Sequence, residues 1–314
     1  MKRYRIRMGK ISLFFVAALL SVIFTLEVRA EVLDIPLYKF APVKNVNLRC
    51  ISNDYVVTIP APERWKITKA VLTVNFVNSI NLIGDISQLS VKINDTPIAQ
   101  ARLNPLSPEN TLKITIPPGL LTPGYNYLSF HAVQHYKKEC EHPCAPDLWT
   151  TLKMEEAMLH LEYDLRPVPL KLSQISSFIY DPKLFPYGQV NIVTEDSTDG
   201  TITVAGVAAS GIAKKFDYRK VMFSTSGDLK QGFDNILIGK KEFVEKALAQ
   251  KGVKVEGING PFIRIMHLPK PLLKKPESDP FHSLLVISGL TQDHLKLAAE
   301  TLAFMNFPFP GRIR

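Results

Sequence analysis

Four residues that commonly bind metals or form covalent cross-links lie within ten positions of one another: His135, Cys140, His142 and Cys144. Two cysteines and two histidines are the ligand types of a tetrahedral zinc site. Their arrangement argues against zinc, because structural zinc sites usually pair their ligands at separations such as C-x2-C or H-x3-H, and Cys140 and His142 have no matching second pair. We therefore predict no metal site and interpret the segment as a structural loop that contains a disulfide bond.

The same segment carries side chains suited to contact with sugars. Trp149 and Tyr136 supply aromatic rings of the kind that stack on pyranose rings, and His135 and Asp147 lie near them in the sequence. A proline-containing loop pinned by a disulfide is pre-organised, so little entropy is lost when one of its aromatic rings stacks on a glucan. We predict that these four residues contact a carbohydrate or a protein partner. The alternative is that Trp149 fills the core of a β-sandwich, as tryptophans in such domains often do.

Catalytic interpretations of the chain are weaker. Asp147, Glu155 and Glu156 are the residue types of a glycosidase acid pair, but the sequence gives no separation between them, and loop carboxylates are usually solvated. Residues 206–211 (GVAASG) have the frame of a phosphate-binding loop, yet Ile212 stands where lysine is required. No G-x-S-x-G nucleophile elbow occurs. We predict no catalytic residue and no enzyme activity.

Strand patterns surround the His135–Trp149 segment and predict a β-domain over residues 47–166. Residues 93–97 (INDTP) favour a hairpin turn of Asx type between two of the strands. Short strands with turn signals at regular spacing predict an antiparallel sandwich or jelly roll. Residues 31–46, with Pro36 and Pro42, are expected to form an extended, weakly structured leader. The seven predicted strands are residues 54–59, 70–77, 87–93, 98–103, 111–116, 126–133 and 158–165.

Residues 166–169 (RPVP) mark a domain boundary, because two prolines make a stiff, extended connector. A ligand of the following domain would bind at the carboxyl ends of its strands, near Lys240 and residues 288–291, but no dinucleotide fingerprint occurs there. Alternating strands and helices predict a parallel sheet, here a flavodoxin-like α/β domain over residues 170–314. The strand patterns are 189–194, 220–224, 235–239, 262–266 and 284–289, and the helical patterns are 200–216, 240–250 and 291–305.

Residues 1–30 have the features of a secretory signal peptide: a basic start, an apolar stretch over residues 11–26, and a small-residue cleavage site, VRA, at 28–30. An uncleaved membrane anchor is the alternative, but this apolar stretch is shorter than the roughly 20 residues needed to span a bilayer. Six of the 38 basic and one of the 29 acidic residues lie in the segment, so its removal leaves 32 against 28, a net charge of +4. No basic stripe with interleaved aromatics remains to indicate a nucleic-acid partner.

Export to an oxidising compartment predicts that cysteines pair. Cys50, Cys140 and Cys144 allow three single pairings, and the sequence does not choose among them. A Cys140–Cys144 bond would close a very short loop, whereas Cys50–Cys140 would tie the start of the β-domain to its central loop. We predict at least one disulfide that includes Cys140, leaving one free thiol.

Several motifs together resemble one family. The residues His135-Tyr136, Cys140-Glu141, Pro143 and Leu148-Trp149 resemble the H-Y…C-E-x-P…L-W signature of the BcsB-like family of bacterial cellulose synthase regulatory proteins. Residues 93–98 (INDTPI), 205–219 with the DYR run, and 284–303 resemble further segments of that family. The similarity covers most of the chain after residue 30.

The resemblance implies a jelly-roll carbohydrate-binding domain followed by a flavodoxin-like domain. It also implies a periplasmic, non-catalytic protein at the inner membrane, whose partners are a membrane-embedded cellulose synthase catalytic subunit and a β-glucan chain. The family repeats this pair of domains and ends in a membrane helix, so the resemblance covers its amino-terminal half. A truncated product, one half of a split subunit and a short paralogue remain open alternatives.

Family descriptions also name cyclic di-GMP. Here the R-x-x-x-R spacing of Arg3 and Arg7 falls in the signal peptide, so we expect no cofactor. The leading hypothesis is an exported accessory subunit of a β-glucan synthase. Its alternative is a free-standing exported carbohydrate-binding protein or glycan-active enzyme.

Overall fold

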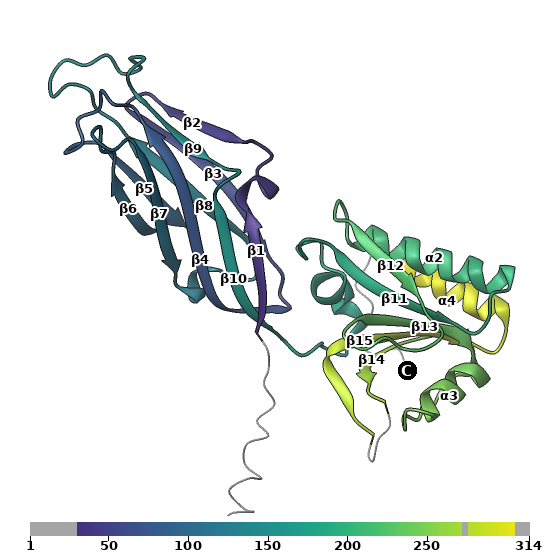
Figure 1. The fold of residues 1–314 in the computed structure, drawn as a ribbon. Coiled ribbons are helices and arrows are strands. Elements are labelled where there is room, and N and C mark those ends of the chain that lie inside the picture. Colours follow the sequence, from purple (N-terminus) through teal and green to yellow (C-terminus); the bar gives the residue numbers. More distant parts are fainter. Residues whose placement is uncertain (1–29, 272–275, 305–314) are drawn as a thin grey trace, which may run out of the picture.

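The computed structural model describes residues 30–271 and 276–304, which form a β-sandwich followed by a three-layer α/β domain (Figure 1). The predicted signal peptide, apart from its last residue, lies outside the described residues. Within the described ranges, no helix is both long and apolar enough to cross a bilayer.

One sheet of the sandwich has six antiparallel strands. Their order is β1-β10-β4-β9-β2, and β7 pairs with the long central strand β4. The strands are β1 (Glu31–Pro36), β2 (Asn45–Arg49), β4 (Trp65–Asn78), β7 (Glu109–Ile116), β9 (Trp149–Lys153) and β10 (Met158–Leu165).

The facing sheet has four antiparallel strands in the order β3-β8-β5-β6. Asn94 and Asp95 join β5 to β6 with φ values of 47° and 65°, which confirms the predicted hairpin turn. Alternate apolar side chains of the two sheets, such as Leu72 and Phe76 of β4 and Phe130 of β8, form one core between them. The strands are β3 (Ser52–Ala61), β5 (Gln88–Ile93), β6 (Thr96–Arg102) and β8 (Gly124–Val133).

The expectation of a weakly structured leader at residues 31–46 is wrong. Residues 31–36 form the edge strand β1, which pairs in register with β10 from Glu31 opposite Tyr163 to Pro36 opposite Met158. Ile35 is 1% exposed and belongs to the core. Burial of this short apolar run against a distant strand outweighs its weak local preference.

The α/β domain is built on a five-stranded sheet in the order β12-β11-β13-β15-β14. The first four strands are parallel, as predicted, but β14 runs antiparallel to β15. Only residues 270–277 join β14 to β15, and a parallel crossover needs roughly a dozen residues or more. The strands are β11 (Gly188–Thr194), β12 (Val221–Thr225), β13 (Asp234–Lys240), β14 (Phe262–Pro269) and β15 (Ser278–Gly289).

Three helices cover this sheet, and they confirm the three helical patterns of the sequence. The pair α2 (Asp199–Lys215) and α4 (Gln292–Phe304) covers one face, and α3 (Lys241–Ala249) covers the other (Figure 1). A Cβ atom at Gly211 would lie 2.5 Å from the Cα of Ala303, so α2 and α4 pack unusually closely. Gly211, the last residue of the phosphate-loop-like run, therefore serves helix-on-helix packing.

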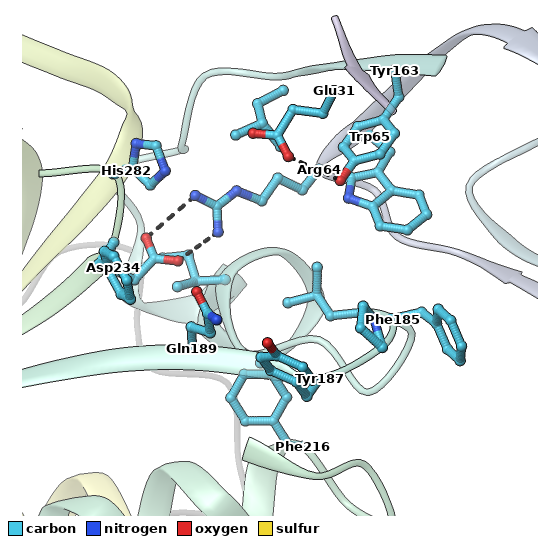
Figure 2. Close-up of a pocket in the computed structure, with 17 residues that line it drawn as sticks. Glu31, Arg64, Trp65, Tyr163, Phe185, Tyr187, Gln189, Phe216, Asp234 and His282 are labelled. Carbon is cyan, nitrogen blue, oxygen red and sulfur yellow. Dashed lines mark hydrogen bonds and ion pairs between the residues drawn. The ribbon is translucent and has the colours of Figure 1, made fainter. Parts of the chain in front are cut away.

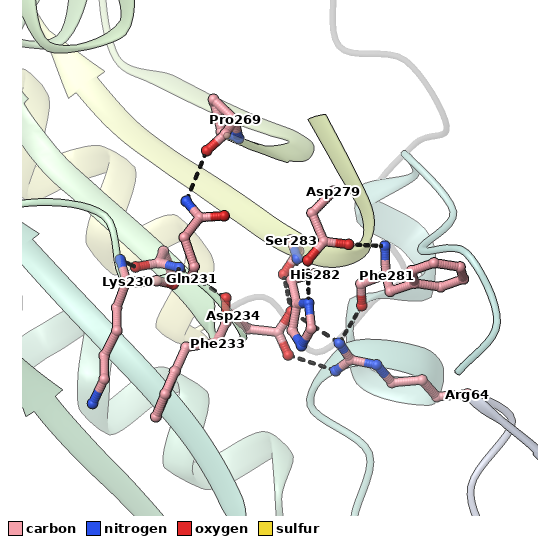
Figure 3. Close-up of polar contacts among 11 residues, drawn as sticks. Arg64, Lys230, Gln231, Phe233, Asp234, Pro269, Asp279, Phe281, His282 and Ser283 are labelled. Carbon is pink, nitrogen blue, oxygen red and sulfur yellow. Dashed lines mark hydrogen bonds and ion pairs between the residues drawn. The ribbon is translucent and has the colours of Figure 1, made fainter. Parts of the chain in front are cut away.

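The two domains meet around one buried ion pair. Arg64, in the turn between β3 and β4, extends to Asp234 at the start of β13, and each side chain is only 7% exposed (Figure 2). The Arg64 guanidinium donates to both carboxylate oxygens, at 2.5 and 3.4 Å, and to the Phe281 carbonyl at 2.5 Å. Ser283 donates to the same carboxylate through its backbone N–H and its hydroxyl, both at 2.8 Å (Figure 3).

The predicted connector is held by both domains. The N–H of Arg166 donates to the carbonyl of Arg64 at 2.8 Å, and the N–H of Val168 donates to the carbonyl of Pro280 at 2.8 Å. Val168 is 2% exposed and joins the core of the second domain. The segment is therefore a hydrogen-bonded part of the junction and not a free spacer.

Candidate functional site

The segment singled out in the sequence forms the loop between β8 and β9, at the end of the sandwich far from the second domain (Figure 1). Gln134 anchors its first residue to the sandwich. The Gln134 amide donates to the carbonyls of Leu48 and Cys50 at 3.2 and 2.9 Å and accepts from the Thr150 hydroxyl at 2.7 Å. This buried glutamine gave no signal in the sequence, because its three partners lie in other parts of the chain.

Glu141 organises the middle of the loop. Its carboxylate accepts from the His135 ring and from the backbone N–H groups of Tyr136 and Lys137, at 3.1 and 3.4 Å for the two N–H groups. Burial on its own would raise the pKa of Glu141, but these hydrogen bonds outweigh burial and lower the pKa. The ring of His135 is thus occupied in holding the loop, which leaves it less available for a partner.

The disulfide joins Cys50 to Cys144, and Cys140 is an exposed free thiol. The prediction that the disulfide includes Cys140 is wrong, whereas the prediction of one disulfide and one free thiol agrees with the structure. Cys50 lies in the turn between β2 and β3, where its N–H donates to the Leu148 carbonyl at 3.1 Å and brings it to the loop. The bond removes Cys144 from the four-ligand zinc set.

Trp149 lies on the outer face of the six-stranded sheet and is not part of the core. In β9 the side chains of Thr150 and Leu152 are fully buried, so by strand alternation Trp149 and Thr151 point outward. Trp149 is half-buried and stands directly opposite Arg49 of β2. Its indole N–H makes no hydrogen bond to another described residue, so ring and N–H are both available to a ligand.

The other two predicted contacts are engaged within the loop region. The Tyr136 hydroxyl accepts from the His142 N–H at 3.0 Å, and the Lys137 ammonium lies 5.4 Å from the centre of the Tyr136 ring. The Asp147 carboxylate accepts from the Asn81 amide at 2.5 Å. The structure therefore brings the four predicted residues to one end of the sandwich and leaves Trp149 as the one whose polar group makes no such contact.

Asp147 does not form a glycosidase pair with Glu155 or Glu156. Asp147 lies before β9 and Glu155 and Glu156 lie after it, and the strand's five residues span roughly 17 Å. Paired glycosidase carboxyl groups stand roughly 5 to 9.5 Å apart. Glu155 instead forms an ion pair with Lys44 at 3.1 Å.

Two carboxylates and Lys240 lie at the carboxyl edge of the parallel strands. Glu195 accepts from the N–H of Lys240 at 3.0 Å, and Asp196 accepts from the N–H and hydroxyl of Thr198 at 3.1 and 2.8 Å. Hydrogen bonds from the Thr201 and Thr198 hydroxyls lower the pKa of Asp196, so it is ionised at neutral pH. The charge of Lys240, the last residue of β13, also lowers the pKa of Asp196, so charges of both signs meet at this edge.

The described residues thus form a β-sandwich followed by a three-layer α/β domain, and both parts match models of one family. Residues 31–165 match the first carbohydrate-binding-module (CBM) domain of cellulose synthase BcsB, and residues 171–313 match its first FD domain. The chain belongs to the cellulose synthase BcsB family.

Curated relatives are distant and much longer. The chain is 25% identical over 263 residues to "Cellulose synthase 2" of Novacetimonas hansenii. The aligned region covers 82% of this chain and 15% of the relative. The chain is 25% identical over 258 residues to the "Cyclic di-GMP-binding protein" of Xanthomonas axonopodis pv. citri (strain 306), covering 79% and 30%. Among solved structures, a family 35 carbohydrate-binding module from an environmental isolate matches with 15% sequence identity and a TM-score of 0.25. The match covers 39% of this chain and 76% of the chain of that module.

Proposed function

We propose that this chain is a periplasmic, non-catalytic subunit of a cellulose (β-glucan) synthase complex. In this role it binds or guides the nascent polysaccharide and supports the membrane-embedded catalytic subunit. The observation that carries the proposal is the match of both domains, in order, to consecutive domains of the BcsB family. The name of the Novacetimonas relative, a cellulose synthase, supports the choice of partner.

We further propose that the first domain is a jelly-roll carbohydrate-binding domain and that the second is flavodoxin-like. The family model named for a carbohydrate-binding module supports the first assignment. The order β12-β11-β13, with parallel strands and helices on both faces, supports the second.

The proposed location is the periplasm, at the surface of the inner membrane. The Cys50–Cys144 disulfide supports export, because such bonds persist in oxidising compartments. We propose no cofactor for this chain. The sequence supports this choice, because the strand ends near Lys240 and residues 288–291 carry no dinucleotide fingerprint.

The proposed glucan contact is the outer surface around Trp149. Directly beside it in the pairing of β2 and β9, the Thr151 hydroxyl donates to the Asn47 amide oxygen at 2.6 Å. An aromatic ring bordered by amide, hydroxyl and guanidinium groups offers both the stacking surface and the hydrogen bonds that a sugar uses.

Trp149→Ala tests this surface. Because Trp149 lies outside the core, we expect the variant to keep its melting temperature and to bind cello-oligosaccharides about tenfold more weakly. Trp65→Ala is the matched control, since Trp65 is 5% exposed and its loss should cost about 3 to 5 kcal/mol of stability. A Trp149→Ala protein that unfolds, or that binds and supports glucan synthesis like the parent, would overturn the assignment.

The place in a synthase complex has its own test. Co-expression with a membrane-embedded cellulose synthase catalytic subunit should allow both proteins to be purified together and should raise glucan output. A protein that binds cello-oligosaccharides but never co-purifies would instead be a free-standing carbohydrate-binding protein. Release of new reducing ends from glucans would identify a glycan-active enzyme.

A further inference from the structure

A cavity of about 260 Å³ lies where the two domains meet (Figure 2). From the sandwich, Glu31, Trp65 and Tyr163 face it, and from the α/β domain, Tyr187 and Gln189 approach from the opposite side. The buried pair of Arg64 and Asp234 borders the cavity and fixes the two sets of side chains relative to each other. The cavity is thus a product of the domain junction.

Aromatic rings form the wall behind the cavity, and three of them, Trp65, Tyr163 and Phe216, are at most 8% exposed. Trp65 stacks on Tyr163 with ring centres 4.3 Å apart. On the other side, Phe216 lies under Gly188, where a Cβ atom would come within 2.3 Å of its ring. Glycine at position 188 therefore allows the ring to pack directly against the start of β11.

Polar groups with unused hydrogen-bonding capacity surround this apolar surface. Tyr187 is 40% exposed and Gln189 is exposed, and neither side chain makes a hydrogen bond to another residue in the described ranges. The Glu31 carboxylate accepts one bond, from the Tyr163 hydroxyl at 3.3 Å. An acceptor, an amide and a hydroxyl thus converge on one small apolar space.

The charges restrict what can bind. Asp234 neutralises Arg64, so the guanidinium does not attract an anion. No ion pair to Glu31 occurs among residues 30–271 and 276–304, but cleavage after residue 30 would place the cationic amino terminus of the mature chain on Glu31 itself. The charged groups at the cavity are thus each balanced by a neighbour, and a neutral molecule with hydroxyl groups and an apolar face fits.

The size restricts the ligand further. Pockets for drug-sized ligands usually enclose roughly 300 to 1,000 Å³. The smaller cavity here suits one or two sugar rings better than a longer chain.

We propose that this cavity binds a neutral pyranose unit, with the ring against the exposed Tyr187 and its hydroxyls bonded to Glu31 and Gln189. The inference rests on the proposed carbohydrate-binding function but not on the Trp149 surface. Strand β4 runs from Trp65 at the cavity to Asn78, which pairs with Thr150 beside the far loop. The two sugar sites would therefore lie at opposite ends of the sandwich.

The chain's two tryptophans separate the sites experimentally, because Trp65 faces the cavity and Trp149 lies at the far loop. In a Trp149→Phe protein, titration with methyl β-glucoside or cellobiose should produce a saturable change in the fluorescence of Trp65. Gln189→Ala in that background should weaken binding about two- to tenfold, and Glu31→Ala about tenfold or more. Both side chains are exposed, so the melting temperature should stay within a few degrees.

Two controls complete the test. Gln250→Ala, an exposed glutamine at the end of α3, should leave the titration unchanged. A glucoside carrying a carboxylate or phosphate should bind more weakly than the neutral sugar, because its charge would lose water in the cavity without gaining a free cationic partner.

The inference is overturned if Trp65 does not respond at millimolar sugar, or if Gln189→Ala and Glu31→Ala bind like the parent. If a Trp65→Phe protein then still shows binding at Trp149, the proposed function stands without the cavity. If neither tryptophan responds to any glucoside, both the cavity site and the proposed carbohydrate binding fail.

Discussion

The Arg64–Asp234 pair is expected to hold the two domains together, and its two halves should respond unequally to mutation. Removing one partner of a buried ion pair usually costs roughly 3 to 5 kcal/mol, because an unpaired charge remains. Arg64→Met leaves Asp234 with two hydrogen bonds from Ser283, so we expect a loss near 3 kcal/mol. Asp234→Ala leaves the buried Arg64 guanidinium with the Phe281 carbonyl as its one remaining partner, and the Nε atom of Arg64 already has none. We therefore expect a loss of stability near 5 kcal/mol.

These costs have an upper limit set by the junction itself. If the domains separate, the unpaired group becomes hydrated, and the penalty disappears at the expense of the junction's other contacts. We therefore expect calorimetry to show two separate unfolding transitions in the variants where the parent shows one. The lower transition should shift by about 10 °C or more. Limited proteolysis should also become faster at residues 166–171, which lose their hydrogen-bonded setting.

An exposed pair provides the matched control. Arg102 and Asp85 stand 3.3 Å apart with side chains 77% and 88% exposed, so Arg102→Met should change stability by less than about 1 kcal/mol. The double variant Arg64→Met/Asp234→Leu should recover most of the loss, because a buried apolar pair carries no unpaired charge. Single variants that match the Arg102→Met control in both calorimetry and proteolysis would refute this account of the junction.

Three further predictions concern other parts of the chain. Cys144→Ser opens the cross-link to Cys50, which spans 94 residues, and should lower the stability of the β-domain by about 2 to 5 kcal/mol in urea unfolding; a change below about 1 kcal/mol would contradict it. Hydrogen bonds with Asp34 and then Glu162 raise the pKa of His160, so their stabilisation is complete below about pH 6.5 and declines as pH rises through the raised value. His160→Gln should accordingly lower the melting temperature more at pH 5.5 than at pH 8.5, and an equal loss at both would count against the pair. Gly188→Ala forces a methyl group onto a buried ring and should destabilise the α/β domain by about 1 to 3 kcal/mol, measured by its calorimetric transition; a neutral result would show that the ring can move.

The sequence was most informative where structure depends on local pattern. The three helices carry their own apolar periodicity, and the hairpin at Asn94 and Asp95 requires residues that tolerate positive φ. The strands of the sandwich that alternate over six or more residues were found for the same reason. Strand β1 was missed because its stability comes from pairing with β10, more than 120 residues away.

In the candidate site, too, local features were predictable from the sequence and contacts between distant residues were not. The loop from His135 to Trp149 was conspicuous in its composition, and strand alternation alone would have placed Trp149 outward had β9 been recognised. The partner of Cys144 was not predictable, because a turn between two strands brings Cys50 to the loop from 94 residues away. Arg64 gave no signal either, since an arginine before a strand is usually solvated and only the second domain explains its burial.

The pairing of β1 with β10 also determines how the sandwich would bear mechanical load. Glu31, where β1 begins, lies opposite Tyr163, just before the chain leaves for the second domain. Tension applied through the two ends of the domain would therefore open the β1–β10 ladder from one end, one pair of hydrogen bonds after another. That geometry resists force less than shear, in which all the bonds of a ladder are loaded together. Such tension would separate β1 first and leave the disulfide-linked far end of the sandwich intact.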